Sequence, residues 1–272
     1  MALEIIRRTE DNMKRSLNIF WLLTLFSIKT TFQQPTGVIF FLIGKIIRFV
    51  IYFLFIYYLV KGTKLLAGYN LDQTIVFFLT FNLIDSLAQL LFREVYRFRQ
   101  LVVSAEFDSV LLKPYHPFLR ILVGGVDILD AVLIFPYLFL LIYFIGKLPG
   151  LSLGKILIYS GLIINAMLIA TSFHILILAL AILTTEVDHA LMIYRDFTRM
   201  VSMPLDIYRE PLRSFLLFVI PVGIMMYVPV RALFGLLTVP VFVNSLAVSV
   251  IFIVFSLWLW NYALKKYQSW GG

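Results

Sequence analysis

The sequence predicts an all-α integral membrane protein with six transmembrane helices, and three observations support that prediction. Only 14% of the 272 residues are charged and the mean hydropathy is +0.96, whereas soluble domains carry about 25% charged residues. The chain contains 26 Phe and 14 Tyr, residues that are frequent at lipid-facing and interfacial surfaces. Largely apolar runs of about 20 residues recur along the chain, and each is long enough to cross a hydrocarbon core as a helix.

The apolar segments divide the chain, taken as one membrane domain over residues 1–272, into a surface helix and six crossings. Residues 1–30 are predicted to form an interfacial helix, because their uncharged stretch, 16–28, is too short to cross the membrane. The run TTFQQP at 30–35 then breaks the helical pattern. The predicted spans are 38–60, 72–92, 121–146, 160–184, 186–205 and 241–263.

The region before the last span is unusual in two respects. Span 186–205 is poorly apolar, since three acids and two Arg precede Pro204. Residues 211–240 are apolar but contain four prolines, about one in every ten residues, and no straight helix accommodates that spacing. Broken helices persist in lipid only where they pack against protein or line a cavity. We therefore predict that 211–240 forms a pair of re-entrant helices.

Basic residues indicate the orientation. With both termini in the cytoplasm, the four inside segments carry 14 Lys and Arg and the three outside segments carry 7. Cytoplasmic loops of membrane proteins hold an excess of Lys and Arg, so this two-to-one ratio favours cytoplasmic termini. It also places the loop 93–120 in the cytoplasm.

The composition and the missing motifs exclude several function classes. The net charge of +8 is typical of cytoplasmic loops, and no basic face suggests nucleic-acid binding. The chain has no Cys, which excludes disulfides and thiolate chemistry. It has neither a phosphate-binding GxxxxGK[ST] motif nor a GxSxG motif. A single Glu186-x-x-His189 spacing falls short of the two that a carboxylate-bridged metal bundle needs. We expect no enzyme activity, metal or cofactor.

The stretch SAEFDSVLLKP in the loop 93–120 predicts a short helix at 105–112. Ser104 followed by acids is good chemistry for a helix start, and Pro114 limits the far end. Phe107, Val110 and Leu111 share one apolar face. Glu106 and Asp108 add polar contacts. Such a helix suits docking into a groove of a partner protein. The alternative is a helix resting on lipid headgroups, which acids facing an anionic leaflet disfavour.

A polar set lies inside the predicted spans. Asn82, Asp85 and Gln89 form one stripe on the second span, and Lys45 and Arg48 share a face of the first. Arg48 and Asp85 lie within about 5 Å in depth, and a charge near the bilayer centre costs ~2.5–3.5 kcal/mol unless it is paired. Two carboxylates of the third span are alternative partners for the basic residues, namely Asp127 and Asp130. The set either lines an inward cleft or forms structural ion pairs.

A second polar group stands at the start of the Pro-rich segment. Tyr208, Arg209 and Arg213 are predicted at the outer face, where they would shape an outer gate. The alternative is that they anchor the chain at the interface, which is the usual role of Tyr and Arg at that depth.

Three stretches of the sequence resemble the permease subunits of type-2 ABC transporters. They are LTFNLIDSLAQLLFREVYRFRQLVVSAEFDSVLLKPYHPFLR at 79–120, FPYLFLLIYF in the third span, and YREPLRSFLLFVIPVGIMMYVPVRALFG at 208–235. The sequence is most similar to the uncharacterised branch in which two different permeases pair over an ATP-binding subunit. Where that family has Gly before the acidic pair, this chain has Ala105, which bears on the geometry of the turn.

The resemblance implies six spans, an N-terminal interfacial helix, cytoplasmic termini and re-entrant helices before the last span. It also implies that the first cytoplasmic loop holds a coupling helix that docks on the ATPase. The expected coupling residues are Glu106, Phe107, Asp108, Val110 and Leu111.

Together these features predict the permease subunit of an ABC exporter, a multi-pass protein of the cell membrane and not an enzyme. ATP would be bound by a partner subunit, because the chain has no nucleotide motif. A second permease, identical or different, would complete the pathway as a homo- or heterodimer in the lipid bilayer. An alternative is an ion-coupled secondary transporter that uses Asp85, Asp127 and Arg48 as its relay.

Overall fold

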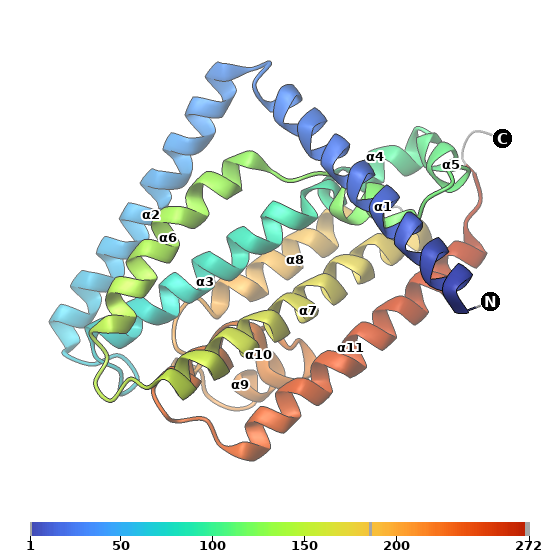
Figure 1. Ribbon diagram of the computed structural model, residues 1–272. Helices are drawn as coiled ribbons and strands as arrows, with labels where there is room; N and C mark the ends of the chain where they lie inside the picture. The colour runs from blue at the N-terminus through green and yellow to red at the C-terminus, as the bar shows by residue number, and fades with distance from the viewer. Residues whose placement is uncertain (1, 185–186, 270–272) are drawn as a thin grey trace.

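The computed structural model describes residues 2–184 and 187–269, which form a bundle of α-helices without a β-strand (Figure 1). The all-α prediction is confirmed. Residue 186 lies outside the described residues, so the start of the predicted fifth span and the Glu186-x-x-His189 spacing do so too.

Among the described residues, five helices are long and apolar enough to cross a membrane. Their starts follow local chemistry: Pro35 occupies the first turn of α2, where a missing N–H costs nothing. Asn70 and Gln73 form a reciprocal capping box at the start of α3. The five helices are α2 (Pro35–Thr63), α3 (Leu71–Phe92), α6 (Ile128–Gly146), α7 (Leu153–Thr184) and α11 (Val239–Lys266).

Helix α1 (Ala2–Thr31) lies across one end of the bundle. We call this the α5 end, because α4, α5 and the last described residues lie there (Figure 1). Gly125 has φ +112°, and a Cβ at that position would lie 2.7 Å from the Leu23 carbonyl oxygen. This glycine therefore permits the close approach of α1 to the turn before α6. The predicted interfacial role of α1 stays a prediction.

The segment after α7 differs from the predicted span 186–205. Helix α8 (Val187–Met200) has 14 residues and is only about 21 Å long at 1.5 Å per residue, short of the ~30 Å hydrocarbon core. The chain leaves the helix at Val201, and Pro204 cannot continue it. A sixth crossing therefore needs the irregular residues after α8, or the bent helix pair that follows.

The Pro-rich segment folds back on itself. Residues Leu212–Val219, which include α9 (Leu212–Ser214), meet α10 (Val222–Leu233) at a bend of 96°. The chain just before the segment and the end of α10 both contact Tyr69: the Tyr69 hydroxyl donates to Asp206, and its ring lies 5.7 Å from that of Phe234. We call this the Tyr69 end of the bundle. The bent pair fits either a broken span or a re-entrant loop, so the predicted re-entrant helices stay a prediction.

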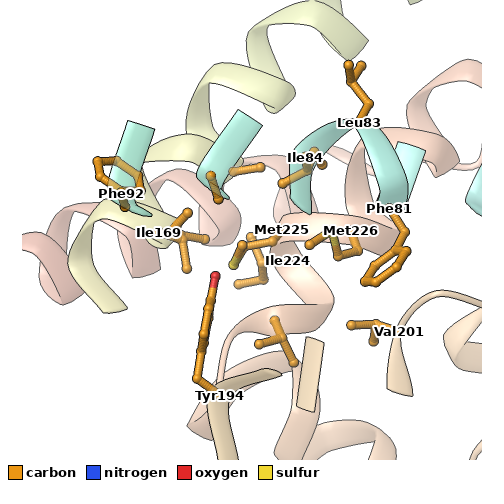
Figure 2. Close-up of a cluster of buried hydrophobic side chains, with 14 of the residues drawn as sticks. Phe81, Leu83, Ile84, Phe92, Ile169, Tyr194, Val201, Ile224, Met225 and Met226 are labelled. Atoms are coloured by element: carbon orange, nitrogen blue, oxygen red, sulfur yellow. The ribbon is translucent and has the colours of Figure 1, made fainter. Parts of the chain in front are cut away.

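Helix α10 is enclosed by protein. Its residues are buried apart from Arg231, which is half-buried. Figure 2 shows Met225 and Met226 packed between α3 and α8, beside Ile84 and Tyr194. This enclosure explains how a helix containing Pro229 persists, since neighbouring helices shield its broken backbone from lipid.

Candidate functional site

The predicted coupling helix is the second half of a helix–turn–helix. Helix α4 (Phe98–Val103) extends α3 through a 3₁₀ turn, and α5 (Glu106–Leu111) follows it. Ser104 ends α4, so the prediction that it starts the next helix is wrong. The start is Ala105, a residue with φ +59° that makes no side-chain cap. Because glycine favours this left-handed region, Ala105 holds the tight turn under strain.

The apolar face of α5 points into the chain. Phe107 is completely buried, with ring centroids 5.0 Å from Phe98 and 6.5 Å from Trp260, and Val110 is buried beside it. Phe107 and Val110, predicted as coupling residues, therefore pack inside the chain and present no surface to a partner, and their role in coupling stays a prediction. Leu111 is 37% exposed and stays a candidate contact.

The outward face of α5 carries different residues. Glu106 and Ser109 are exposed, and the two residues after the helix, Leu112 and Lys113, continue the same side. Leu112 is 87% exposed. We call Glu106, Ser109, Leu112 and Lys113 the outer face of α5. Sequence reasoning missed Leu112 because it lies one residue beyond the apolar stripe.

Asp108 fastens α5 to the end of α11. Its carboxylate accepts hydrogen bonds from the hydroxyls of Tyr267, at 2.7 Å, and Ser269. The bonds from Ser269 and Tyr267 stabilise the charged form and lower the pKa of Asp108. Burial and the bond to Asp108 raise the pKa of Tyr267 to about 12. Phe107 stacks edge-on against the same Tyr267, at 5.2 Å, so α5 and α11 are joined by a polar and an apolar contact.

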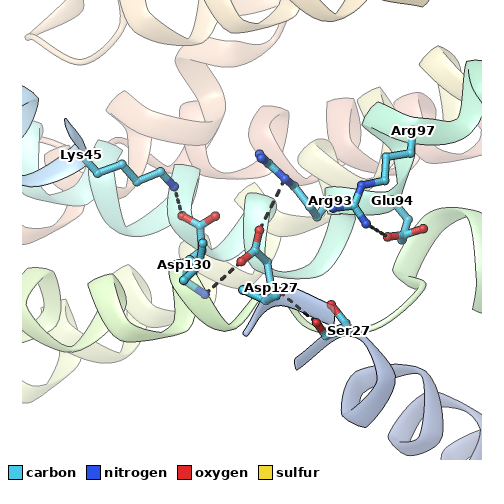
Figure 3. Close-up of polar contacts among 9 residues, drawn as sticks. Ser27, Lys45, Arg93, Glu94, Arg97, Asp127 and Asp130 are labelled. Carbon is cyan, nitrogen blue, oxygen red and sulfur yellow. Dashed lines mark hydrogen bonds and ion pairs between the residues drawn. The ribbon is translucent and has the colours of Figure 1, made fainter. Parts of the chain in front are cut away.

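Two of the predicted intramembrane acids form ion pairs between helices (Figure 3). Lys45 of α2 pairs with the buried Asp130 of α6, one of the alternatives that the sequence left open. Arg93 lies 3.4 Å from Asp127, which also accepts a hydrogen bond from the Leu129 amide and so caps α6. These contacts tie α2 and the end of α3 to α6.

Arg48, Asn82 and Asp85 line a cavity of about 130 Å³ between α2, α3 and α8, whereas Gln89 lies outside the lining. Arg48 and Asp85 both face it, but no direct ion pair joins them; Asp85 instead accepts a hydrogen bond from Gln89 at 2.7 Å. The amide of Asn82 donates to the Phe78 carbonyl of its own helix, at 2.7 Å. Sequence reasoning missed Arg195 and the other four polar lining residues, since α8 could not be placed against α2: Tyr52, Thr198, Arg199 and Ser202.

Asp206 is the centre of the Tyr69 end. One oxygen accepts from Tyr69 at 2.8 Å and Tyr227 at 2.6 Å, and the other lies 2.7 Å from Arg213. Burial and the bond to Asp206 raise the pKa of Tyr69. We call these four residues the Asp206 cluster. It joins the loop before α3, the segment after α8 and both arms of the bent pair.

The residues predicted at the outer gate have different positions. Arg213 belongs to the Asp206 cluster. The hydroxyl of Tyr208 donates to the Met200 carbonyl at 2.8 Å, which fixes the chain after α8. Arg209 is exposed and its role as a gate residue stays a prediction. Asp206 itself was missed, because its partner Tyr69 is 137 residues away in the sequence and its other partners lie beyond the turn after α8.

Comparison with known protein families identifies the chain. A family model described as an ABC-2 family transporter protein matches residues 46–271. The chain belongs to the ABC-2 transporter family. No curated protein and no solved structure matches it. ABC-2 chains are transmembrane permease subunits without catalysis of their own, so this protein is a membrane permease subunit of an ABC transporter.

The family match covers α5, the cavity and the Asp206 cluster, whereas α1 and Lys45 lie outside it. An ABC transporter contains an ATP-binding subunit as well as its permease. The cavity lies between α2, α3 and α8, and the Asp206 cluster lies at the Tyr69 end of the bundle.

Proposed function

We propose that this ABC-2 permease is the membrane half of an exporter of the cell membrane, driven by ATP hydrolysis in a partner subunit that docks on the outer face of α5. The observation that supports this most strongly is the two-sidedness of α5. Its inner face is fixed by Phe107 and Asp108, whereas its outer face leaves a large apolar side chain, Leu112, in the open. Exposed apolar side chains beside charged ones are typical of interaction sites.

The contacts of α5 suggest how a partner's movement would reach the spans. Helix α4 continues α3, and α5 is bonded to the end of α11 through Tyr267. A displacement of α5 would therefore shift the ends of two spans together. Under this proposal the α5 end is cytoplasmic, which agrees with the excess of basic residues there and places both termini inside.

A second permease would complete the pathway. Helices α2 and α11 are the most exposed of the five long helices, with 6% and 17% of their apolar windows buried. Surfaces of this kind face either lipid or another subunit. We propose that a second permease, either a copy of this chain or a related chain, packs against these helices.

The test is to substitute the outer face without disturbing the inner one. Leu112→Asp should abolish ATP hydrolysis coupled to transport in the complex reconstituted with the ATP-binding subunit, and it should weaken copurification of that subunit. Leu153→Asp is the matched control, because Leu153 is 71% exposed at the start of α7. Normal coupling in Leu112→Asp would overturn the docking proposal. Proton-driven uptake by this chain alone would favour the ion-coupled alternative.

A further inference from the structure

The cavity between α2, α3 and α8 has aromatic walls and a basic interior. Phe49 and Tyr52 of α2 stack on Phe78 of α3, with ring centroids 5.3 and 5.1 Å apart. The hydroxyl of Tyr52 lies 2.9 Å from that of Ser202 and bridges α2 to the segment after α8. Arg48, Asp85 and Arg195 are among the lining residues, together with Asn82, Thr198 and Arg199.

The charges in the cavity do not balance. The guanidinium groups of Arg48 and Arg195 make no ion pair or hydrogen bond within residues 14–184 and 189–269, and Asp85 is the one carboxylate among the lining residues. The nearby acids of α6 already form ion pairs: Asp130 pairs with Lys45, and Asp127 pairs with Arg93. Arg199 has its own partner, Asp196, at 3.5 Å. At least one guanidinium therefore lacks a counter-ion within the described part of the chain.

The depth of the cavity makes this imbalance costly. Arg48 is near the middle of the 29-residue helix α2, about 20 Å from its start at 1.5 Å per residue. Charged side chains at such depth are rare, and they pair with one another or mark a ligand pathway. An anion that enters from outside the chain would supply the missing pairing.

The geometry points to a specific ligand class: we propose that this cavity binds the anionic headgroup, a phosphate or a carboxylate, of an amphiphile. Arg48 and Arg195 would hold the oxygens, since a guanidinium presents paired donors that match such groups. The aromatic rings and the exposed apolar face of α2, which includes Ile47 and Ile51, would accept the tail. That this ligand is the transported molecule rests on the proposed function; the binding itself does not.

The charge of Asp85 provides a test in which the direction of the change in anion affinity is predicted. Its carboxylate faces the same cavity as the two arginines, and so it repels an incoming anion while reducing the net positive charge. Removing that negative charge should strengthen anion binding, whereas removing either arginine should weaken it. A cavity that merely held structural polar residues would show neither trend.

The experiment measures binding to the purified full chain in phosphatidylcholine nanodiscs by titration calorimetry. The probes are dodecyl phosphate, dodecyltrimethylammonium and inorganic phosphate. We expect saturable binding of dodecyl phosphate and none of the cationic amphiphile. Arg48→Gln and Arg195→Gln should each weaken binding about tenfold or more, the loss expected for one charged hydrogen bond. Asp85→Asn should bind more tightly, and Arg209→Gln, an exposed arginine outside the cavity, should match the wild type.

Equal binding of the cationic amphiphile would overturn the proposal, and this comparison needs no variant to fold. Unchanged affinity in both arginine variants would also overturn it. Inorganic phosphate binding as tightly as dodecyl phosphate would refute the amphiphile and identify a free anion as the ligand. No ATP-binding subunit takes part, so failure here leaves the proposed function standing. Failure of the coupling test likewise leaves the binding result intact.

Discussion

Replacing Phe107 by Ala should unfold the α4–α5 region locally while the spans stay intact. The ring is completely buried and contacts Phe98, Trp260 and Tyr267. Truncating a buried Phe to Ala costs about 3–5 kcal/mol, and each 1.4 kcal/mol is about tenfold in an equilibrium constant. Backbone amides at 98–113 should therefore exchange about 100-fold faster or more, up to the limit set by global unfolding.

Hydrogen exchange followed by mass spectrometry measures this directly in detergent or nanodiscs. Leu112→Ala is the control, because the side chain is largely exposed and its loss should leave exchange at 98–113 unchanged. Leu112→Ala should still impair binding of the ATP-binding subunit. If Phe107→Ala kept wild-type exchange but lost the partner, Phe107 would be a contact residue and the inner-face assignment would be refuted.

Four further predictions concern other contacts. Ala105→Gly should relieve the left-handed strain and stabilise the turn by about 1 kcal/mol, seen as slower exchange at 104–106; faster exchange would contradict it. Lys45→Met, which leaves Asp130 buried without its partner, should cost about 3–5 kcal/mol in a denaturant titration, and a double variant with Asp130→Leu should recover most of it. Asp206→Ala should release the loop before α3, with faster exchange at 64–70 but not at 98–113. The pKa of Asp108 is lowered in the folded chain, so its contribution to stability is present above its unfolded pKa of about 3.9 and is lost as pH falls through the lower folded value. Amide exchange at 267–269 should therefore rise only below about pH 4. Asp108→Asn should abolish that rise.

The spans could be predicted because their cause is local. Length and hydropathy alone identify a helix such as α7, and four closely spaced prolines exclude a straight helix over 211–240. Helix α8 departs from its predicted span because its charges and Pro204 shorten it, and a sequence of intermediate hydropathy does not show where the helix ends.

The site could be predicted only in part, because its contacts are long-range. Periodicity showed correctly that Phe107 and Val110 share an apolar face of α5. Periodicity could not show whether that face packs against a partner or against the chain's own α11, since an apolar face fits either. The similar depths of Arg48 and Asp85 along their spans indicated that they lie close together, and both face the same cavity. Depth could not show which acid pairs with Lys45. Asp206 has partners at 69, 213 and 227, a coincidence that no local pattern reveals.

The enclosure of α10 has a consequence for biogenesis. A helix surrounded by α3, α7, α8 and α11 has almost no surface to offer to lipid. It cannot be stably inserted alone as the chain leaves the ribosome, because its prolines and Arg231 would then face hydrocarbon without shielding neighbours. The four helices around α10 must therefore surround it in place of lipid, and α11 is synthesised after α10. Assembly of this protein therefore ends with α10 being closed in from the C-terminal side.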